Sequence, residues 1–237
     1  MSTHLSAYGQ PIGPPVEDWR ERQGPQRVAL NGRYCRVTPI DVERDATALF
    51  EAYMLAPDDR DWTYLAQERP RCLASFREYL AKNAASSDPL HYAIIDRPGE
   101  RAVGTAALMR IEPVHGVIEV GYITFSPKLK RTRASSEAMY LLMRYVFDEL
   151  GYRRYEWKCD SLNAPSRAAA KRYGFQFEGI FRQAIVYKGR SRDTAWFSVI
   201  DKDWPRIRTA FETWLNPENH DAGGQQRRAL ATIRDSL

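Results

Sequence analysis

Two groups of polar residues in this chain have the types and the spacing to do chemistry. A basic loop, Lys128–Arg133, follows an apolar segment and precedes the most regular helical pattern of the sequence. Cationic side chains and the free N–H groups of a helix N-terminus both bind phosphates. Further along, Asn163-Ala-Pro-Ser166 stands at a predicted strand-to-helix junction, and Gly174-Phe175 follows it. Together the two groups indicate an enzyme that holds a phosphorylated carrier and works at the end of that carrier.

The length, composition and charge of the chain indicate a globular protein without a membrane segment or a metal site. With 237 residues and a hydrophobic fraction of 43%, the chain fits one large globular domain with additional arms. No apolar run approaches the ~18–20 residues of a membrane helix, and the N-terminus has no apolar signal segment, so we expect no membrane association and a cytoplasmic location. The formal net charge of +5 permits an anionic ligand without requiring nucleic acid. The 3 cysteines and 4 histidines lack metal-ligand spacing, so we expect no metal.

Three parts follow one another along the chain. Residues 1–29 are rich in Pro and Gly and predict an extended arm, which either hangs loose or is anchored by Trp19. Residues 30–216 carry the strand and helix patterns of a folded domain. Residues 217–237 are polar and charged, and we expect a C-terminal tail there, although its last part could form a short helix.

The patterns of the central part predict an α/β (α+β) fold. Alternating or apolar strand patterns cover residues 32–39, 91–96, 102–111, 117–125, 154–159, 177–187 and 194–200. Helical patterns cover residues 42–55, 70–83, 134–150, 164–173 and 202–215. The strand–helix–strand unit over residues 117–159 predicts one parallel pair, and the remaining connections predict antiparallel pairs.

The order of these elements and motifs resembles the GNAT acyltransferases, and within them the branch of ribosomal-protein alanine and serine N-acetyltransferases (the Rim type). The resemblance spans roughly residues 33–214 and rests on Glu119-Val-Gly-Tyr122, Lys130–Ser135, Ser136-Glu137-Ala138, Asn163-x-x-Ser166, Gly174-Phe175 and Arg192-Asp193. It implies the GNAT acyl-CoA N-acyltransferase fold, a mixed and mostly antiparallel sheet flanked by helices. It also implies that the two central parallel strands splay apart to admit acetyl-CoA, the acyl donor.

The resemblance assigns the basic loop to the cofactor's pyrophosphate. The family pattern, Arg/Gln-x-x-Gly-x-Gly/Ala, aligns with residues 130–135. Arg133 stands where the pattern has a glycine, and its guanidinium offers a bidentate, charged contact to phosphate instead. A solvated basic turn is the alternative. The expected cofactor-binding residues are Tyr122, Ile123, Phe125, Lys130, Arg131, Thr132, Arg133, Ala134, Ser135 and Asn163.

The same resemblance implies direct acyl transfer from the thioester to an amine. Glu119 is the candidate general base, acting through water, and its apolar neighbours predict a raised pKa; a surface carboxylate is the alternative. The tyrosine acid of many relatives is replaced here by Ala170, so Ser166 is the candidate that protonates the thiolate, unless it only supports the helix start. Backbone N–H groups near residues 122–125 are the expected oxyanion donors.

The expected function is an acetyl-CoA-dependent N-acetyltransferase, monomeric or dimeric, that acts on a primary amine. The α-amino group of a protein, peptide or aminoacyl compound is the expected acceptor, and no specific nucleic acid is expected. Trp62 and Tyr64 either wall the acceptor side or pack. Two other functions fit the residues: a basic nucleic-acid- or ribosome-associated binding module, and a CoA-binding homologue without catalysis.

Overall fold

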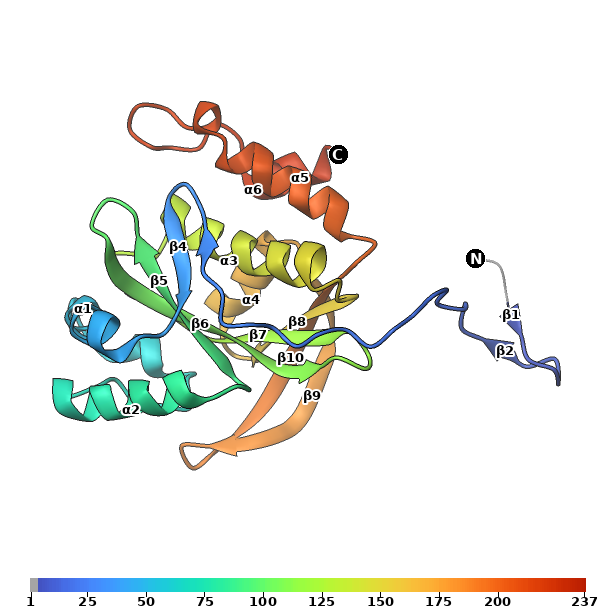
Figure 1. Cartoon of the computed structure of the whole chain (residues 1–237), viewed down its shortest axis with the longest axis horizontal. Coiled ribbons are helices and arrows are strands. Elements are labelled where there is room, and N and C mark those ends of the chain that lie inside the picture. The colour runs from blue at the N-terminus through green and yellow to red at the C-terminus, as the bar shows by residue number, and fades with distance from the viewer. Residues whose placement is uncertain (1–3) are drawn as a thin grey trace.

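The computed structural model describes residues 4–237 and is built on an eight-stranded sheet. The strand order is β3-β4-β5-β6-β7-β8-β10-β9, and every neighbouring pair is antiparallel except β7–β8 (Figure 1). The strands are β3 (Leu30–Asn31), β4 (Cys35–Pro39), β5 (Leu90–Asp96), β6 (Arg101–Glu112), β7 (Val117–Phe125), β8 (Arg154–Asp160), β9 (Gln176–Tyr187) and β10 (Arg190–Ile200). The predicted mixed, mostly antiparallel sheet is therefore confirmed.

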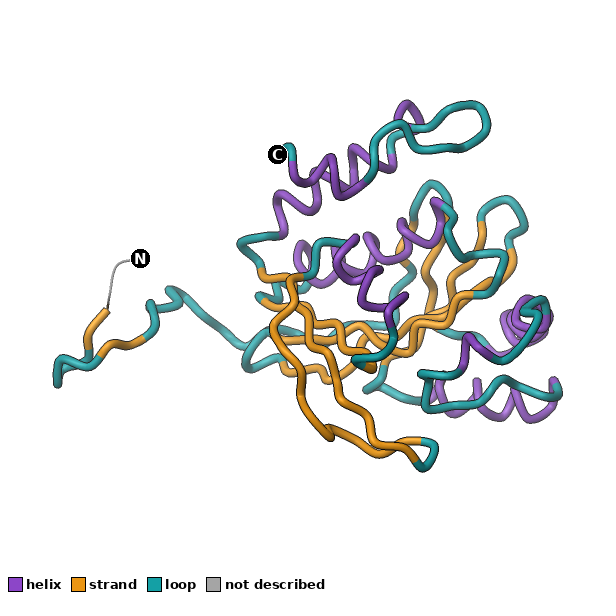
Figure 2. The backbone as a smooth tube through the Cα atoms, turned by 180° about the vertical axis from the view of Figure 1, so that it is seen from behind, coloured by secondary structure: helices purple, strands orange, loops and turns teal. Residues whose placement is uncertain are grey.

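Helices cover both faces of the sheet (Figures 1 and 2). One face carries α1 (Val42–Met54) and α2 (Leu73–Ala85); the other carries α3 (Arg133–Arg144), α4 (Ala164–Arg172), α5 (Trp204–Leu215) and α6 (Leu230–Asp235). Alternate side chains of strand β5 point to opposite faces of the sheet. Tyr92 and Ile94 belong to the core under α3, whereas Ala93 and Ile95 belong to the core under α1 and α2. Within residues 4–237, no helix is long and apolar enough to cross a membrane.

Local sequence signals place most helix starts. Asp41 caps α1 through its side chain, which accepts a hydrogen bond from the Arg44 N–H. The second helix was expected from Pro70 but begins at Leu73, after an extended Cys72. Helix α3 ends its α-helical part at Arg144, and a π-helical turn, Tyr145–Glu149, completes the predicted span to residue 150.

The C-terminal segment is more ordered than a polar tail. Helix α6 packs against α5, and Leu230 and Ile233 are buried in the same core as α3. The short helix that the last part of residues 217–237 could form is therefore present, but it packs on the domain and is not a free tail. Three apolar residues in a six-residue helix give too short a pattern to predict this packing.

The N-terminal arm is extended, as its composition predicted. Its short hairpin, β1 (His4–Leu5) with β2 (Pro11–Ile12), lies away from the domain (Figure 1). The later part of the arm runs along the domain: the Trp19 indole N–H donates to the Val114 carbonyl at 2.9 Å, and the Gln26 N–H donates to the Tyr145 hydroxyl at 2.7 Å. Trp19 therefore does anchor the arm.

A buried carboxylate ties α3 to the edge of the sheet. Glu137 is 4% exposed and accepts hydrogen bonds from the backbone N–H groups of Arg33, Tyr34 and Cys35, at 2.8, 2.6 and 2.8 Å. The turn approaches so closely that a Cβ atom at Gly32 would clash with this carboxylate. Glu137 therefore fixes α3, and with it the basic loop before α3, against β4.

We predict that Glu137→Ala destabilises the fold by at least about 3 kcal/mol, because three backbone donors lose a charged acceptor. Urea unfolding measures this change. Glu149→Ala, which removes an exposed carboxylate just after α3, is the matched control and should stay within about 0.5 kcal/mol of the wild type. Equal unfolding midpoints for the two variants would contradict the structural role of Glu137.

Candidate active site

The central feature of the site is an opening between β7 and β8. The two parallel strands pair only from Val117 with Arg154 to Val120 with Trp157. Beyond that point β7 stays bonded to β6, and β8 stays bonded to β10, so the remaining halves of the two strands diverge. Their facing backbone N–H and C=O groups are left free to bond to a ligand.

A β-bulge in β7 accompanies the divergence. Tyr122 has φ +49°, and the pairing with β6 shifts register between Thr105–Thr124 and Ala107–Gly121. A bulge bends its strand and re-aims the side chains beside it. Residues 121–125 consequently form one wall of the opening, and they include Tyr122, Ile123 and Phe125, three of the expected cofactor-binding residues.

The basic loop lies at one end of the opening, where α3 begins. Thr132 caps the helix, since its side chain accepts a hydrogen bond from the Ser135 N–H at 3.1 Å. Arg131 has φ +61°, the left-handed conformation, whereas Arg133 begins the helix. The arginine at the family's glycine position therefore carries no left-handed strain. Within the described chain, no backbone acceptor is found for the N–H groups of Arg131, Arg133 and Ala134, and such donors suit an anion.

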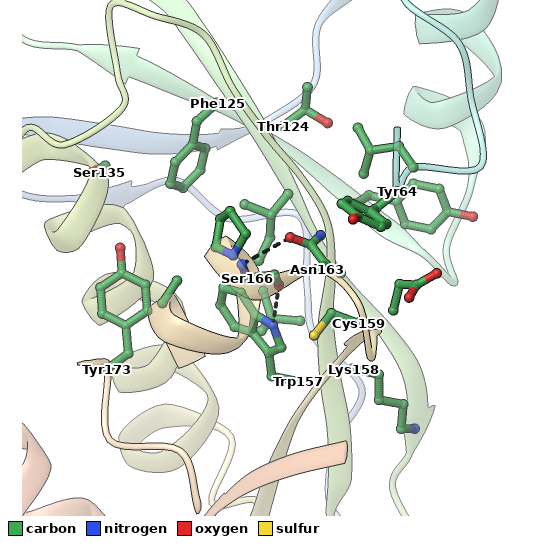
Figure 3. A pocket seen from close by; sticks show the side chains of 18 of the residues that line it. Tyr64, Thr124, Phe125, Ser135, Trp157, Lys158, Cys159, Asn163, Ser166 and Tyr173 are labelled. Atoms are coloured by element: carbon green, nitrogen blue, oxygen red, sulfur yellow. Dashed lines mark hydrogen bonds between the residues drawn. The ribbon is translucent and has the colours of Figure 1, made fainter. Parts of the chain in front are cut away.

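Asn163 and Ser166 lie deeper in the opening, at the start of α4. The Asn163 carboxamide caps this helix by accepting from the Ser166 N–H at 3.1 Å. The Ser166 hydroxyl accepts a hydrogen bond from the Trp157 indole N–H at 3.0 Å (Figure 3). Because the indole can only donate, the serine O–H remains available to donate to a further group.

Glu119 lies in the opposite wall, inside a cluster of charges. Its carboxylate is 3.0 Å from Lys158 Nζ and 3.1 Å from Arg110 Nε. Lys158 is also paired with Glu156 at 2.7 Å and lies 3.7 Å from the centre of the Trp196 ring. Burial raises the pKa of Glu119, while Lys158 and Arg110 act in the opposite direction. The expected direction of this pKa shift is confirmed.

These walls enclose a single large cleft of about 2060 Å³. It brings together nearly all of the residues that the sequence singled out. Lining residues among them are Tyr64, Glu119, Tyr122, Ile123, Phe125, Lys130, Arg131, Thr132, Arg133, Ser135, Asn163 and Ser166. Ala134 does not line the cleft, because its side chain packs into the core.

Trp62 and Tyr64, predicted as a pair, have different surroundings. Tyr64 lines the cleft, and its hydroxyl donates a hydrogen bond to the Leu162 carbonyl at 3.2 Å. This bond joins the loop that carries Tyr64 to the loop before α4. Trp62 is 3% exposed and packs against Tyr53 with ring centres 5.8 Å apart. It lines instead a smaller cavity of about 180 Å³ under α2, which Tyr122 also lines.

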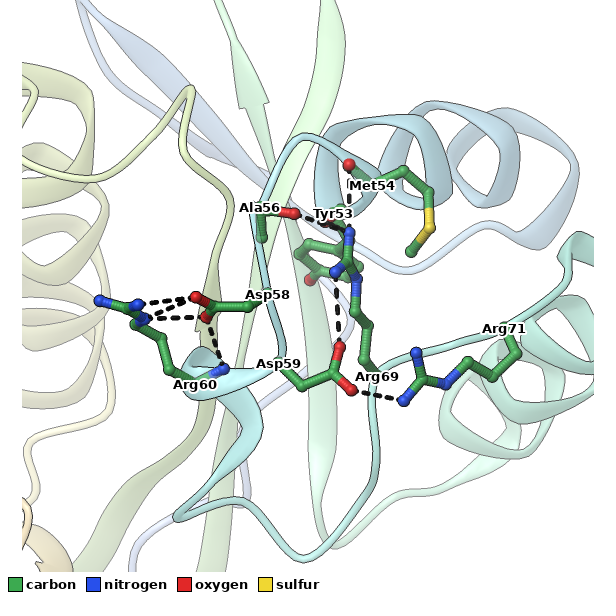
Figure 4. A network of polar contacts seen from close by, with 8 residues as sticks. All are labelled: Tyr53, Met54, Ala56, Asp58, Asp59, Arg60, Arg69 and Arg71. Atoms are coloured by element: carbon green, nitrogen blue, oxygen red, sulfur yellow. Dashed lines mark hydrogen bonds and ion pairs between the residues drawn. The ribbon is translucent and has the colours of Figure 1, made fainter.

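A network of charged groups holds the loop that carries Tyr64 (Figure 4). Arg69 donates to the carbonyl groups of Tyr53, Met54 and Ala56 at the end of α1, at 3.2, 3.1 and 2.9 Å. The same guanidinium is 3.4 Å from Asp59, whose other oxygen pairs with Arg71. Arg69 thereby satisfies carbonyls that the end of a helix leaves without partners.

Several lining residues escaped the sequence interpretation. Trp157, Lys158 and Cys159 come from β8, and Arg172 and Tyr173 from the end of α4. Alternation along β8 was the available signal for Trp157 and Cys159, which share one face of the strand. Trp214, His220 and Gly224–Gln226 of the C-terminal segment also line the cleft, and no local pattern predicts this.

We predict that Arg69→Met lowers the melting temperature, because three helix-end carbonyls lose their donor; the loss corresponds to about 1–3 kcal/mol. Differential scanning calorimetry measures it. The control is Arg71→Met, because the Arg71 side chain is 72% exposed and its ion pair contributes little. A melting temperature equally unaffected in both variants would exclude this role for Arg69.

Comparison with known proteins gives the same architecture. A GNAT-family acetyltransferase from Brucella melitensis has 47% sequence identity and a TM-score of 0.91, covering 93% of this chain and 100% of its own. A GNAT-family protein from Chromobacterium violaceum has 40% identity and a TM-score of 0.76, over 83% and 98% of the two chains. The uncharacterized N-acetyltransferase p20 of Bacillus licheniformis is 30% identical over 113 residues, which are 48% of this chain and 63% of p20.

More distant likeness shows the fold alone. RimL, solved as a ribosomal α-N-protein acetyltransferase in complex with coenzyme A, has 19% identity and a TM-score of 0.59, over 73% of this chain and 99% of its own.

The family model described as the acetyltransferase (GNAT) domain matches residues 36–176, which include β7, the basic loop, β8 and α4. The chain therefore belongs to the GNAT acetyltransferase family, whose members take the acyl group from acetyl-CoA.

Proposed function

We propose that this protein is an N-acetyltransferase that moves the acetyl group of acetyl-CoA directly to a primary amine, the α-amino group of a protein, peptide or aminoacyl compound. The observation that carries the proposal is the opening between β7 and β8, with the basic loop at one end and both Glu119 and Ser166 on its walls. A phosphorylated, thioester-bearing carrier fits this arrangement from end to end.

The chemistry follows from the groups in the opening. The amine nitrogen attacks the thioester carbonyl, a C–N bond forms, the C–S bond breaks, and the thiolate leaves. Unpaired backbone N–H groups of the diverging half of β7 suit the oxyanion of the tetrahedral intermediate. In this proposal Ser166, whose hydroxyl accepts a hydrogen bond from the Trp157 indole, gives a proton to the sulfur.

Glu119 is the proposed base for the ammonium proton of the acceptor. Burial raises its pKa toward the range in which a carboxylate takes up a proton efficiently. Lys158 and Arg110 hold its oxygen in place at 3.0 and 3.1 Å. A water molecule would carry the proton from the amine to this carboxylate.

The acceptor is proposed to enter beside the loop that carries Tyr64. The β9–β10 turn also reaches this loop, because Lys188 donates to the Trp62 carbonyl at 2.8 Å and pairs with Glu68 at 3.1 Å. Asp61 lines the cleft on the same side, where its carboxylate pairs with Lys130 of the basic loop. In this proposal Tyr64 touches the acceptor, and the buried Trp62 packs beneath the loop that carries Tyr64.

Assignment to the Rim-type branch is a finer proposal. It rests on the sequence Asn163-x-x-Ser166 and on the oriented serine hydroxyl that this spacing produces. Under this proposal the acceptor is a protein α-amino group.

Incubation with labelled acetyl-CoA and a panel of amines tests the function. We expect label in α-amino acceptors, and acetyl-CoA at a hundredfold excess over its Kd should stabilise the fold by about 2.7 kcal/mol. Stabilisation without transfer to any amine would favour the CoA-binding homologue. Salt-sensitive RNA binding without a response to acetyl-CoA would favour the nucleic-acid module.

For Glu119→Gln we predict a loss of about 10²–10⁴ in kcat with nearly unchanged acetyl-CoA affinity. In the wild type, kcat should rise as pH increases through the raised pKa of Glu119, because the base acts in its deprotonated form; the variant should lose this limb. Glu156→Gln is the control, since Glu156 pairs with the same Lys158 but does not line the cleft. This variant should keep the rising limb but show it at lower pH, because the charge of Glu156 contributes to the raised pKa of Glu119. Identical pH profiles for wild type and Glu119→Gln would remove Glu119 from the mechanism.

For Ser166→Ala we predict a lower kcat, because the thiolate loses its proton donor. Trp157→Phe keeps the serine hydroxyl but removes the group that orients it, so its kcat should fall less. Turnover of an acetyl thioester whose thiol has a low pKa should partly restore Ser166→Ala, since such a leaving group needs no proton. Wild-type turnover in Ser166→Ala would leave the serine a structural role only.

A further inference from the structure

The C-terminal segment, which lies outside the matched GNAT domain, forms the outer end of the cleft. His220 and Gly224–Gln226 line it together with Arg133 and Arg172. The space beside Gly224, where a Cβ atom would lie, is 4.0 Å from Arg133 Nη2. This loop is held in shape, because His220 bridges to Gln226 and the Trp214 indole N–H donates to Gln226 at 2.6 Å.

Two guanidinium groups are fixed at this end by aromatic rings. Arg133 lies over the Tyr34 ring, 4.7 Å from its centre, and Arg172 lies over the Trp214 ring at 4.9 Å. Arg172 also donates to the Ser136 hydroxyl at 2.9 Å. Neither guanidinium makes an ion pair within residues 4–237. Two preorganised cations without a carboxylate partner favour an anionic ligand.

A buried ring nitrogen points to the same conclusion independently. His220 is 7% exposed and packs edge-on against Trp214, with ring centres 5.1 Å apart. Its Nδ1 lies 3.4 Å from the Asn216 carbonyl, whereas its Nε2 is buried with no hydrogen-bond partner in the described chain. A buried polar atom without a partner is unfavourable, so a ligand that completes its hydrogen bond gains affinity.

The order of groups along the cleft identifies the ligand. Under the proposed function, Ser166 and Glu119 act at the thioester and the Lys130–Ser135 loop binds the pyrophosphate; all of these residues line the same cleft. In coenzyme A the group beyond the pyrophosphate is a 3′-phosphorylated adenosine. We therefore propose, resting on the function above, that Arg133, Arg172 and the His220–Gln226 loop form a built subsite for the 3′-phosphate end of acetyl-CoA.

The test compares coenzyme A with 3′-dephospho-coenzyme A by isothermal titration calorimetry. We expect the wild type to bind coenzyme A about 10- to 100-fold more tightly, which matches the loss of one or two charge-assisted hydrogen bonds. Arg133→Gln, Arg172→Gln and His220→Phe should each lower this ratio, and Phe retains the edge-on contact with Trp214. Arg227→Gln removes one exposed charge from the same segment outside the cleft and should leave the ratio unchanged.

The outcomes separate this subsite from the function it rests on. A ratio near one in the wild type, or one unchanged in all three cleft variants, overturns the subsite while leaving the acetyltransferase proposal intact. A failure of the wild type to bind either compound refutes both. Point substitutions are used because deleting residues 217–237 would also remove Leu230 and Ile233 from the core, and melting curves confirm that each variant is folded.

Discussion

Parallel strands can exchange hydrogen bonds only while they run side by side, and β7 and β8 do so for four residue pairs. The rest of the site depends on this short pairing. Up to Val120 and Trp157 the two strands are hydrogen-bonded to each other and the sheet is continuous. After these residues β7 stays bonded to β6 and β8 stays bonded to β10, so the sheet opens between β7 and β8 without losing its outer pairings. A ligand placed there meets unpaired backbone on both sides.

Neighbouring elements hold this opening in place. Glu137 fixes α3 against β4, and the basic loop therefore stands at a set position over the opening. Arg69 fixes the loop between α1 and α2, and Tyr64 of this loop is bonded to the Leu162 carbonyl at the edge of the cleft. Both are charged groups largely removed from water that bond to backbone atoms, and such contacts give strong geometric control because an unmet partner would be costly.

Charge is divided along the cleft in a way that suits the proposed reaction. Cationic side chains and free N–H groups gather near the start of α3, whereas Glu119 is held within a balanced cluster of Arg110, Lys158 and Glu156. An anionic carrier is thus favoured at one end, while the carboxylate at the other end stays fixed and buried. The C-terminal segment extends the cationic end beyond the matched domain.

The sequence by itself determined the elements and the order of the chemistry along them. Apolar periodicity predicted the strands and helices, and the basic loop and Asn163-x-x-Ser166 were located at strand-to-helix junctions. Each of these signals is carried by residues close together in the sequence, so a single amino-acid sequence is sufficient to identify it.

Only the tertiary structure decided which groups meet. The bond from Trp157 to Ser166 spans nine residues, that from Glu137 to Tyr34 spans 103, and His220 reaches the cleft from outside the matched domain. It also separated Trp62, which is buried, from Tyr64, which lines the cleft. Such contacts depend on how the helices pack on the sheet and on where a strand bends. Short stretches of sequence do not specify the distances between residues that are far apart in the chain.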